Sequence, residues 1–426
     1  MLKFECGWKS TLPPAPVPLG LEGPLKVKYA VLGGGFTGLA CARRLAELHP
    51  DEDVAVLESE RLGDGNSGRN SGFLMHTSFY ADDPPSLHNA RNRLQKAGLA
   101  EIQRTVEAHR IDCDWQPWGN LYGALTVQEE CHLEDRAAPY RAAGETLEAW
   151  SATDMEAATG SSRFRRGLFH RGSVLVQPVA LMRGLAQTLP ANVKLFEASP
   201  ALSITRHRSA FRIETPLGRL DADKVFICVN GDIPAFGYGA NRLVKVATFA
   251  ALSSPLDPGG RGLASSAAFG LLPSFLGGPT IRKTRDNRLL VRDHFVFAPD
   301  RAIPADAIHD FIRKAQSIAR FRWPHTPVTF DFAWGGTMVL ARNSGRFFGE
   351  MAKGVFLSAC CNGAGNTLGT ASGKLLAELA AGQRTPLLND HLAIPQPSWV
   401  PPKVVLRHFV NRQLSAATKR KAGAHH

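Results

Sequence analysis

Two kinds of hydrophobic pattern alternate along this chain of 426 residues. One is a short, continuous apolar run, as at residues 29–32 and 54–57, which is typical of a strand buried on both faces of a sheet. Between these two runs, apolar residues recur with helical spacing at Leu39, Ala42 and Leu45. The order strand, helix, strand predicts a parallel sheet with a covering helix.

The other pattern is an alternation of apolar and polar residues, which predicts strands of an antiparallel sheet. It covers residues 244–252, 289–297 and 328–334, and a helical pattern over residues 305–319 interrupts it. Charged segments with helical periodicity precede it, at residues 90–109 and 129–143.

Continuous apolar runs return at residues 192–197, 224–231 and 354–361, so strands from the whole chain join the parallel sheet. We therefore predict an α/β fold in which an α+β domain, built on an antiparallel sheet, is inserted into the parallel-sheet domain. The predicted units are an extended proline-rich arm (1–24), the parallel-sheet domain (25–85, 166–242 and 345–385), the inserted domain (86–165 and 243–344) and a C-terminal basic extension (386–426).

A glycine fingerprint follows the first apolar run. Its glycines have the G-x-G-x-x-G spacing. The first glycine makes a tight turn, the second lets the backbone approach a pyrophosphate, and the third lets helix and strand pack closely. Glu58 ends the second strand, 20 residues after Gly38, where a Rossmann-like fold places a carboxylate for ribose hydroxyls. An ordinary glycine-containing turn is the alternative. The predicted dinucleotide site consists of Gly33, Gly35, Phe36, Thr37, Gly38, Glu58 and Ser59.

A polar, glycine-containing segment comes next, at residues 61–73. Its glycines let the backbone run close to a ligand, and Ser67, Arg69 and Asn70 supply donors for phosphate and ribitol oxygens. An ordinary surface loop is the alternative. Because the segment follows the fingerprint, we predict that it contacts the same cofactor through Gly68, Arg69, Asn70, Ser71 and Gly72.

The fingerprint, Glu58 and the sequence Ser67-Gly-Arg-Asn-Ser-Gly72 together resemble the FAD-dependent amine and amino-acid oxidoreductases, which include D-amino-acid oxidase, glycine oxidase and sarcosine oxidase. This form of the segment, with a proline-rich arm that carries Trp8, is most similar to the gamma-glutamylputrescine oxidase branch. The resemblance covers nearly the whole chain. It implies FAD as cofactor, a Rossmann-like FAD-binding domain and an inserted substrate domain.

The resemblance also implies cofactor contacts on later strands. Val193 would contact the adenine through its backbone, and Asn230 and Gly231 end a strand near the cofactor. A glycine- and asparagine-containing loop then leads into a helix, whose N-terminal dipole would favour an anionic reduced flavin. The residues implied in this loop are Asn362, Gly363, Ala364, Gly365, Asn366 and Thr367.

In this family the reaction is hydride transfer from the carbon that bears the amine to flavin N5, after which the imine hydrolyses to a carbonyl and ammonia. The substrate would be a small amine, with oxygen or another compound as electron acceptor. The family's mechanism requires no fixed catalytic residue. His76 is a candidate to take the proton of the substrate ammonium, with a structural histidine as the alternative. Trp334, with two glycines after it, resembles the family's W-x-G beside the flavin ring, and this resemblance makes it the second candidate for a catalytic role.

Two departures from the family's pattern bear on the substrate and the flavin. Amino-acid members carry an arginine that clamps the substrate carboxylate, and Met338 stands at that position, with Arg342 as a weaker substitute. Residues 334–345 contain no cysteine for a covalent flavin bond, so we expect noncovalent FAD. The lysine that sarcosine oxidases use with oxygen has no counterpart in residues 288–292, which leaves oxidase and dehydrogenase open.

Two other kinds of function stay open. One is oxidation of an α-amino acid, a 2-hydroxy acid or glycerol phosphate on the same fold. The other is a non-catalytic flavin-binding subunit. Ammonia release would separate amine oxidation from hydroxyl oxidation, and an absence of anaerobic flavin bleaching would indicate the subunit.

Composition narrows the location and the partners. Seven cysteines without a C-x-x-C motif, and no apolar signal core, lead us to expect a cytoplasmic protein without a metal site. The net charge of +12 is scattered, which argues against nucleic acid but would attract anions. In the tail, one helical face would pack against the protein or dock on an acidic membrane; it carries Leu406, Phe409, Val410 and Leu414.

Overall fold

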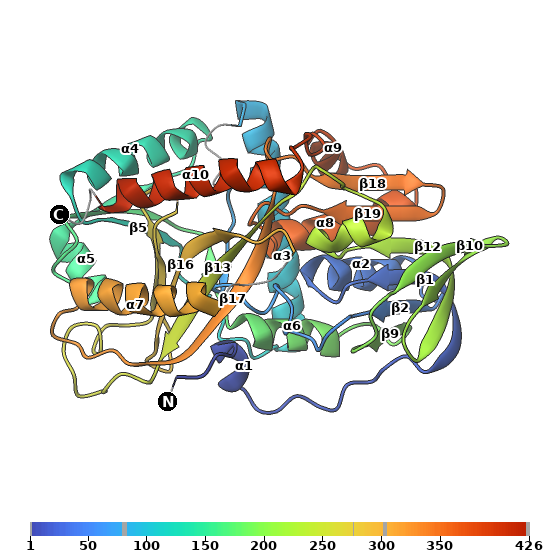
Figure 1. Cartoon of the computed structure of the whole chain (residues 1–426), viewed down its shortest axis with the longest axis horizontal. Helices are drawn as coiled ribbons and strands as arrows, with labels where there is room; N and C mark the ends of the chain where they lie inside the picture. The colour runs from blue at the N-terminus through green and yellow to red at the C-terminus, as the bar shows by residue number, and fades with distance from the viewer. Residues whose placement is uncertain (1, 79–82, 276, 301–304, 423–426) are drawn as a thin grey trace.

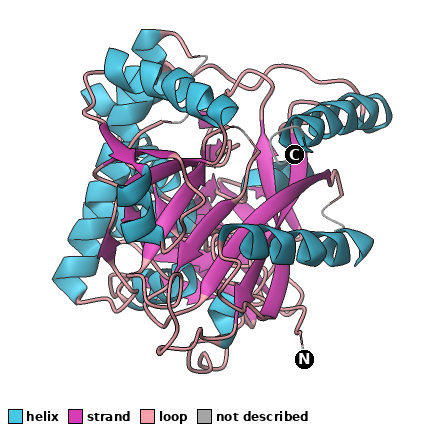
Figure 2. Cartoon of the chain, turned by 90° about the vertical axis from the view of Figure 1, so that its left-hand side faces the viewer, coloured by secondary structure: helices cyan, strands magenta, loops and turns pink. Residues whose placement is uncertain are grey.

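Two eight-stranded sheets lie side by side along the long axis of the molecule (Figure 1). The computed structural model describes residues 2–78, 83–275, 277–300 and 305–422, with the side chains of 305 and 414–422 outside the description. A small three-stranded sheet joins segments that run between the two large ones. Figure 2 shows the second large sheet as a broad layer with helices beside it.

The first sheet has the parallel core that the continuous apolar runs predict. The order of this core is β9-β2-β1-β12-β19, and each neighbouring pair is parallel. The hairpin of β10 and β11 continues the sheet antiparallel to β12, and β18 pairs antiparallel with β19. The bounds are β1 Gly23–Leu32, β2 Val54–Leu57, β9 Val193–Phe196, β10 Ser203–His207, β11 Ala210–Glu214, β12 Gly218–Ile227, β18 Phe347–Ala352 and β19 Val355–Ala359.

Three helices pack in series against this sheet because glycines let their backbones meet. α2 packs on α8, and α8 packs on α3. A Cβ on Gly373 of α8 would lie 2.0 Å from the carbonyl oxygen of Thr37, and a Cβ on Gly98 of α3 would lie 1.8 Å from that of Thr367. The helices of this domain are α2 Phe36–Leu48, α3 Pro85–His109, α6 Pro178–Gln187, α8 Thr367–Ala380 and α9 Pro386–Leu392.

The second sheet contains the predicted alternating strands in the order β17-β13-β16-β15-β14-β5-β7-β6. Its neighbours are antiparallel apart from β14 and β5, and α7 packs on one face through Phe311 and Ala315. The bounds are β5 Asn120–Ala124, β6 Glu148–Ser151, β7 Arg166–His170, β13 Val244–Ser253, β14 Phe269–Pro273, β15 Thr280–Lys283, β16 Leu289–Phe297, β17 Phe330–Leu340, α4 Val127–Ala142, α5 Ala152–Thr159 and α7 Ala305–Arg322.

Two segments lie on the other side of the predicted domain boundaries. β7 was expected in the parallel-sheet domain, but it pairs with β5 and β6 of the second sheet. α3 was expected in the inserted domain, but it packs on α8 and α9 of the first. Hydrophobic periodicity gives the type of an element and not the sheet on which it packs. The chain crosses between the domains at the third sheet, made of β3 Phe73–Leu74, β4 Gln116–Pro117 and β8 Val174–Leu175.

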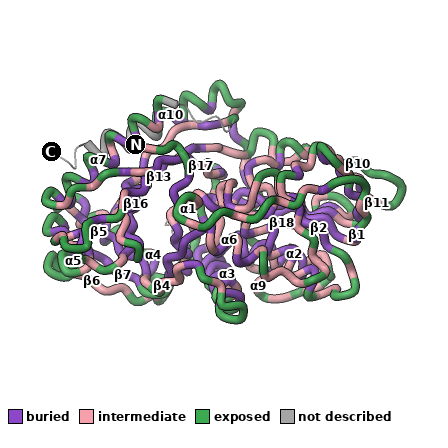
Figure 3. The backbone as a smooth tube through the Cα atoms, turned by 90° about the horizontal axis from the view of Figure 1, so that it is seen from below, coloured by how far each residue is buried: buried purple, intermediate pink, exposed green. Residues whose placement is uncertain are grey.

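The N-terminal arm holds the two domains together. The arm was predicted to be extended throughout, but it contains one short helix, α1 Gly7–Ser10. A helix can form there because the prolines begin only at Pro13. α1 lies between β17 and α6 (Figure 3). Lys3 pairs with β17 through backbone hydrogen bonds at Asp331 and Ala333.

The tail helix, α10 Lys403–Ala422, packs on the second sheet. Leu406 and Val410 are buried against a cluster that includes Val246 and Met338, whereas Phe409 is 55% exposed. The side chain of Leu414 lies outside the description. Packing against the protein is thus what the structure shows for the described part of α10. Within the described residues, no helix combines the length and apolarity needed to cross a membrane.

Candidate cofactor and substrate site

The glycine fingerprint forms the turn between β1 and α2. Gly33 has a φ of +101°, and a Cβ on Gly38 would lie only 1.8 Å from the Gly33 carbonyl oxygen. Both positions therefore require glycine. α2 begins after Gly35 without a side-chain cap, so its first amides have no protein side chain as acceptor. An anionic group fits such a helix N-terminus.

Glu58 lies beside this turn at the end of β2. Its Oε2 accepts a hydrogen bond from the backbone N–H of Gly34 at 2.7 Å, and its Oε1 accepts one from the N–H of Glu60 at 3.0 Å. Burial raises the pKa of the Glu58 carboxyl, and these hydrogen bonds oppose the rise. The carboxylate thus connects β2 to the fingerprint, at the edge where a dinucleotide ribose would lie.

The polar segment after Glu58 connects the first domain to β17. Arg69 donates from Nε to the carbonyl of Asp64 at 2.6 Å and from Nη1 to the carbonyl of Gly335 at 3.1 Å. Asn66, which the sequence analysis did not single out, accepts from the N–H of Thr337 at 2.8 Å and donates to its hydroxyl at 2.9 Å. The Arg69 side chain therefore holds protein backbone groups, and its predicted contact with the cofactor stays a prediction.

The N-terminal arm supports the same segment from the other side. The indole of Trp8 donates to the carbonyl of Asn70 at 2.8 Å, and Lys9 pairs with Asp64 at 2.7 Å. The side chain of Asn70 accepts from the N–H of Gly72 and donates to the carbonyl of Ser67. These contacts fix the segment before any ligand binds.

The loop between β19 and α8 lies next to the polar segment and β3. The Nδ2 of Asn362 donates to the carbonyl of Gly345 at 2.8 Å, so its side chain is used within the protein. Asn366 donates to the carbonyl of Phe73 at 3.1 Å, and Thr367 donates to that of Met75 at 2.8 Å. α8 therefore begins beside the strand that leaves the polar segment, and it too has no side-chain cap.

Of the remaining predicted positions, Asn230 and Gly231 lie around the same edge, after the end of β12. The Oδ1 of Asn230 accepts from the N–H groups of Cys360 and Cys361 at 3.0 and 3.2 Å. Gly231 follows in the 3-10 helix Asn230–Phe236. Val193 instead begins β9, in register with Val54 at the start of β2, so it lies at the amino ends of the parallel strands. The structure therefore does not bring Val193, predicted to contact the adenine, together with the other predicted cofactor residues, because the first and last residues of a strand lie at opposite edges of the sheet.

Apart from Val193, the structure thus brings the predicted segments to the carboxyl ends of the parallel strands, where such sheets bind nucleotides. Two uncapped helix N-termini and a turn that excludes side chains fit the diphosphate and ring of FAD.

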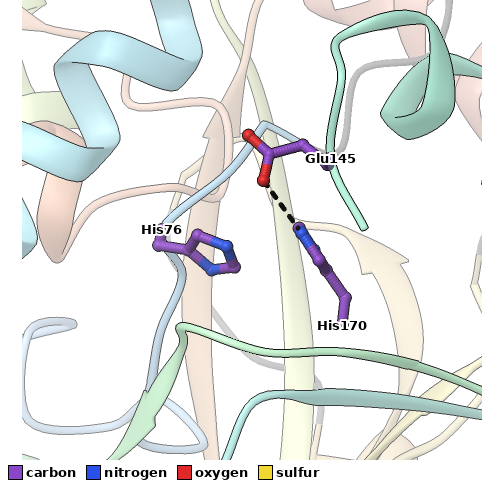
Figure 4. Close-up of side chains that lie close together, drawn as sticks. All are labelled: His76, Glu145 and His170. Atoms are coloured by element: carbon purple, nitrogen blue, oxygen red, sulfur yellow. Dashed lines mark hydrogen bonds and ion pairs between the residues drawn. The ribbon is translucent and has the colours of Figure 1, made fainter. Parts of the chain in front are cut away.

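His76 lies in a buried cluster with His170 and Glu145 (Figure 4). Its Nδ1 is 2.9 Å from the hydroxyl of Ser173, and the two imidazole centroids are 4.5 Å apart. His170 Nε2 lies 3.2 Å from Glu145, whose other oxygen pairs with Lys96 at 2.6 Å.

Burial, with a smaller effect from His170, lowers the pKa of His76 to about 4. A histidine with this pKa is neutral and only weakly basic near pH 7, which does not support the predicted proton-accepting role. Ligand atoms of the three side chains lie within 4.8 Å of one another, a donor set that suits a divalent transition metal. Because Lys96 already neutralises the carboxylate, the cluster is balanced without an ion.

Trp334 faces the cofactor segment rather than open space. Its indole donates to the carbonyl of Arg69 at 3.0 Å, and its ring meets that of Trp8 edge-on at 6.4 Å. The hydrogen bond from Arg69 to the carbonyl of Gly335, the residue after Trp334, lies next to this indole. These contacts support a positioning role for Trp334, and its predicted catalytic role stays a prediction.

The strand that carries Trp334 also presents Met338, whose surroundings the sequence did not reveal. The guanidinium of Arg292, on β16, approaches the Met338 sulfur at 3.3 Å and lies 4.8 Å from the ring centroid of Phe295. Arg342, the weaker candidate for a substrate clamp, is exposed beyond the end of β17. The one sequence signal for Arg292 is the alternation of apolar and polar residues over 289–297, which indicates the face of the strand on which Arg292 lies. This alternation does not indicate which strand lies beside it.

Comparisons with known proteins match the chain over most of its length. A family model described as FAD dependent oxidoreductase (DAO) matches residues 28–379. A protein named probable oxidoreductase OrdL from Rhizobium meliloti (strain 1021) is 29% identical over 91% of each chain. Gamma-glutamylputrescine oxidoreductase from Escherichia coli (strain K12) is 26% identical over 85% of each.

Solved structures match the fold. Glycine oxidase from Geobacillus kaustophilus superposes with a TM-score of 0.71 at 20% identity, covering 85% of this chain and 96% of that one. L-proline dehydrogenase from P. horikoshii superposes with a TM-score of 0.70 at 15% identity, covering 86% and 98%. The predicted fold class and the predicted FAD-dependent family are confirmed.

Proposed function

Because the chain belongs to the DAO family of FAD-dependent oxidoreductases, we propose that it oxidises a C–N bond of a small amine. The observation that supports this most is the joining of β17 to the cofactor segment. Arg69 and Asn66 hold Gly335 and Thr337, so the face that carries Trp334 and Met338 would border the FAD site proposed here. The relative named gamma-glutamylputrescine oxidoreductase supports an amine as substrate.

The residues that would hold FAD divide by their part in the site. The fingerprint turn and the N-terminus of α2 would receive the diphosphate, and Glu58 would accept hydrogen bonds from ribose hydroxyls. The N-terminus of α8 would lie against the flavin and stabilise negative charge on its reduced ring. When bound, FAD supplies an acceptor for the hydride.

The substrate reaction balances without a covalent bond to the protein. The amine loses a hydride from carbon and a proton from nitrogen, which leaves an imine. Water adds to the imine carbon, and the C–N bond breaks to give a carbonyl compound and ammonia. The protein's part is to position the neutral amine against the cofactor and to exclude bulk water. Oxygen or another compound would then reoxidise the cofactor.

An anaerobic screen tests this function. Polyamines, amino acids, aminosulfonates and aminophosphonates are mixed with the yellow protein, and the flavin absorbance is followed. Each amine is paired with its hydroxyl analogue as a control. Bleaching by an amine supports the proposal. Bleaching by the hydroxyl analogues alone would favour hydroxy-acid oxidation, and no bleaching by any compound would favour a non-catalytic subunit.

We propose that the FAD is noncovalent, since residues 334–345 contain no cysteine for attachment. Denaturing the protein in acid and removing the polypeptide should leave the flavin in the supernatant. Flavin fluorescence that stays with the denatured polypeptide on a gel would contradict a noncovalent site.

A further inference from the structure

We propose that Arg292 binds an anionic group, a carboxylate in the first instance, on the substrate amine. The inference rests on the proposed function and adds to it the substrate class: an amine that carries a carboxylate, recognised by a guanidinium from β16 instead of from β17. Four features of the second sheet support it, namely the direction of Arg292, its lack of an anionic partner, its nearness to Met338 and the small residues beside it.

Strand alternation directs Arg292 to the face that borders the cofactor segment. Asp293, the next residue, is buried and pairs with Lys314 of α7 at 2.9 Å, so it faces the helix side of the sheet. Arg292 is in register with Ala250 of β13, and Ala250 is in register with Trp334 of β17. Side chains in register across neighbouring strands share a face. Arg292 therefore shares the face of Trp334.

In the part of the chain that the structure describes, the half-buried guanidinium of Arg292 has no carboxylate partner, whereas two fully buried arginines each have one. Arg282, which is fully buried, pairs with Asp114 at 3.0 Å, and Arg91 pairs with Asp83 at 2.6 Å. Within the described residues, the polar and ring contacts of Arg292 are the Met338 sulfur and the Phe295 ring, and no carboxylate pairs with it. Burial lowers the pKa of Arg292 to about 10, which still leaves it charged at neutral pH.

Removing a guanidinium from water costs free energy unless an anion pairs with it. A thioether is a weak acceptor, and an aromatic face compensates the charge only in part. A carboxylate would accept two parallel hydrogen bonds from the guanidinium. The geometry therefore favours an anion supplied by a ligand.

Small residues lie on the strip of the sheet next to Arg292, below the side chains of Arg69 and Asn66. Gly336 of β17 is in register with Thr248 of β13, and Ala250 follows on the same face. Trp334 and Met338 flank Gly336 at the two ends of this strip. A ligand extending from the cofactor segment toward Met338 would meet the guanidinium there.

The first experiment measures binding without turnover, so that it does not depend on amine oxidation. The FAD-loaded protein is titrated with glutarate, a dicarboxylate without an amine, by calorimetry and by the shift of the flavin spectrum. We expect saturable binding that Arg292→Met weakens about tenfold to a hundredfold, the range of a charge-assisted hydrogen bond. Arg292→Lys should retain part of the affinity.

A matched control removes the same charge elsewhere. Arg342→Met lowers the net charge equally but alters an exposed residue, and it should leave glutarate affinity unchanged. FAD content and thermal midpoint are measured for each variant, and Arg292→Lys serves for comparison if Arg292→Met folds poorly. Equal loss in the Arg342 and Arg292 variants, or no loss in either Arg292 variant, would overturn the proposal.

The second experiment concerns the substrate. Anaerobic flavin reduction is compared for an alkylamine and for the same amine with a terminal carboxylate. The carboxylated amine should be preferred by the unaltered protein, and Arg292→Met should remove that preference while leaving the plain amine within about threefold. A preference that survives in Arg292→Met would overturn the role of Arg292. Absence of reduction by every amine, with glutarate binding intact, would contradict the proposed function and leave the anion site standing.

Discussion

Single side chains in this site mostly bind backbone groups of distant segments. Glu58, Asn66 and Asn362 each hold a backbone N–H, and Arg69 holds two carbonyls. Such contacts fix loops that have no regular hydrogen-bond ladder of their own. The cofactor would therefore meet a preformed surface, with little ordering left to occur on binding.

We predict that Glu58→Ala weakens FAD binding more than it weakens the fold. The carboxylate holds the N–H of Gly34 and would accept hydrogen bonds from the ribose, each charge-assisted bond contributing about 1.5–3 kcal/mol. The dissociation constant of FAD from the apoprotein should rise at least about tenfold. The dissociation constant of FAD from Glu58→Gln should lie between the values for the unaltered protein and for Glu58→Ala. A variant with unchanged FAD affinity would show that Glu58 only ends the strand.

We predict that the burial of His76 makes the protein less stable in mild acid. The folded pKa of His76, about 4, lies below the ordinary value of 6.5, so the unfolded chain binds more protons between these values. The free energy of unfolding should therefore fall as pH drops from about 6.5 toward 4, by about 2 kcal/mol at pH 5 for this group alone. Above pH 7 His76 should contribute no pH dependence.

Denaturant unfolding at a series of pH values checks this. His76→Asn should flatten the fall between pH 7 and pH 5, whereas His325→Asn, which alters an exposed histidine, should not. The neighbours His170, Glu145 and Lys96 stay in place in both variants. An identical pH profile in all three proteins would show that His76 is not buried as described.

At the scale of elements, the cofactor site depends on how closely α2, α3 and α8 pack. The sequence predicted each of these helices and the strands between them, because their hydrophobic periods are clear. It did not predict that α3 packs on α8, or that β7 joins the second sheet, because periodicity carries no information about partners. Arg292 was missed for the same reason, since its neighbour Met338 is on a different strand.

We predict that Gly373→Ala lowers both stability and FAD content. Its Cβ would lie 2.0 Å from the carbonyl oxygen of Thr37, so α8 would have to move away from α2, at a cost of about 1–3 kcal/mol. Gly259→Ala is the control, because its nearest neighbour is a carboxylate oxygen at 3.6 Å. Thermal unfolding and flavin absorbance per polypeptide give the two readouts. Equal behaviour of the two variants would contradict the close helix contact.

At the scale of the whole molecule, the arm and the tail both bind the second sheet. α1 packs near Trp334 and α10 packs near Met338, so segments close to both ends of the described chain lie against β17. The sequence predicted the tail helix and two alternative roles for its apolar face, packing against the protein or docking on an acidic membrane. It could not distinguish packing from membrane docking, because the same apolar face serves either.

We predict that Leu406→Asp releases α10 from the sheet. Leu406 is buried against Val246 and Met338, and placing a charge there forfeits about 2 kcal/mol of apolar burial. Hydrogen exchange of residues 403–413 should become faster. Phe409→Asp, on the exposed side of the same helix, should leave exchange unchanged. Protection that persists in Leu406→Asp would show that other contacts hold α10.

The central claim is that the chain uses FAD to oxidise a C–N bond, and ammonia counted against flavin tests it most directly. The FAD-loaded protein is mixed anaerobically with a primary amine identified by the screen, and ammonia is measured after a single reduction of the flavin. We expect ammonia equal to the flavin reduced, together with the matching carbonyl compound. Flavin reduction without ammonia would contradict the account.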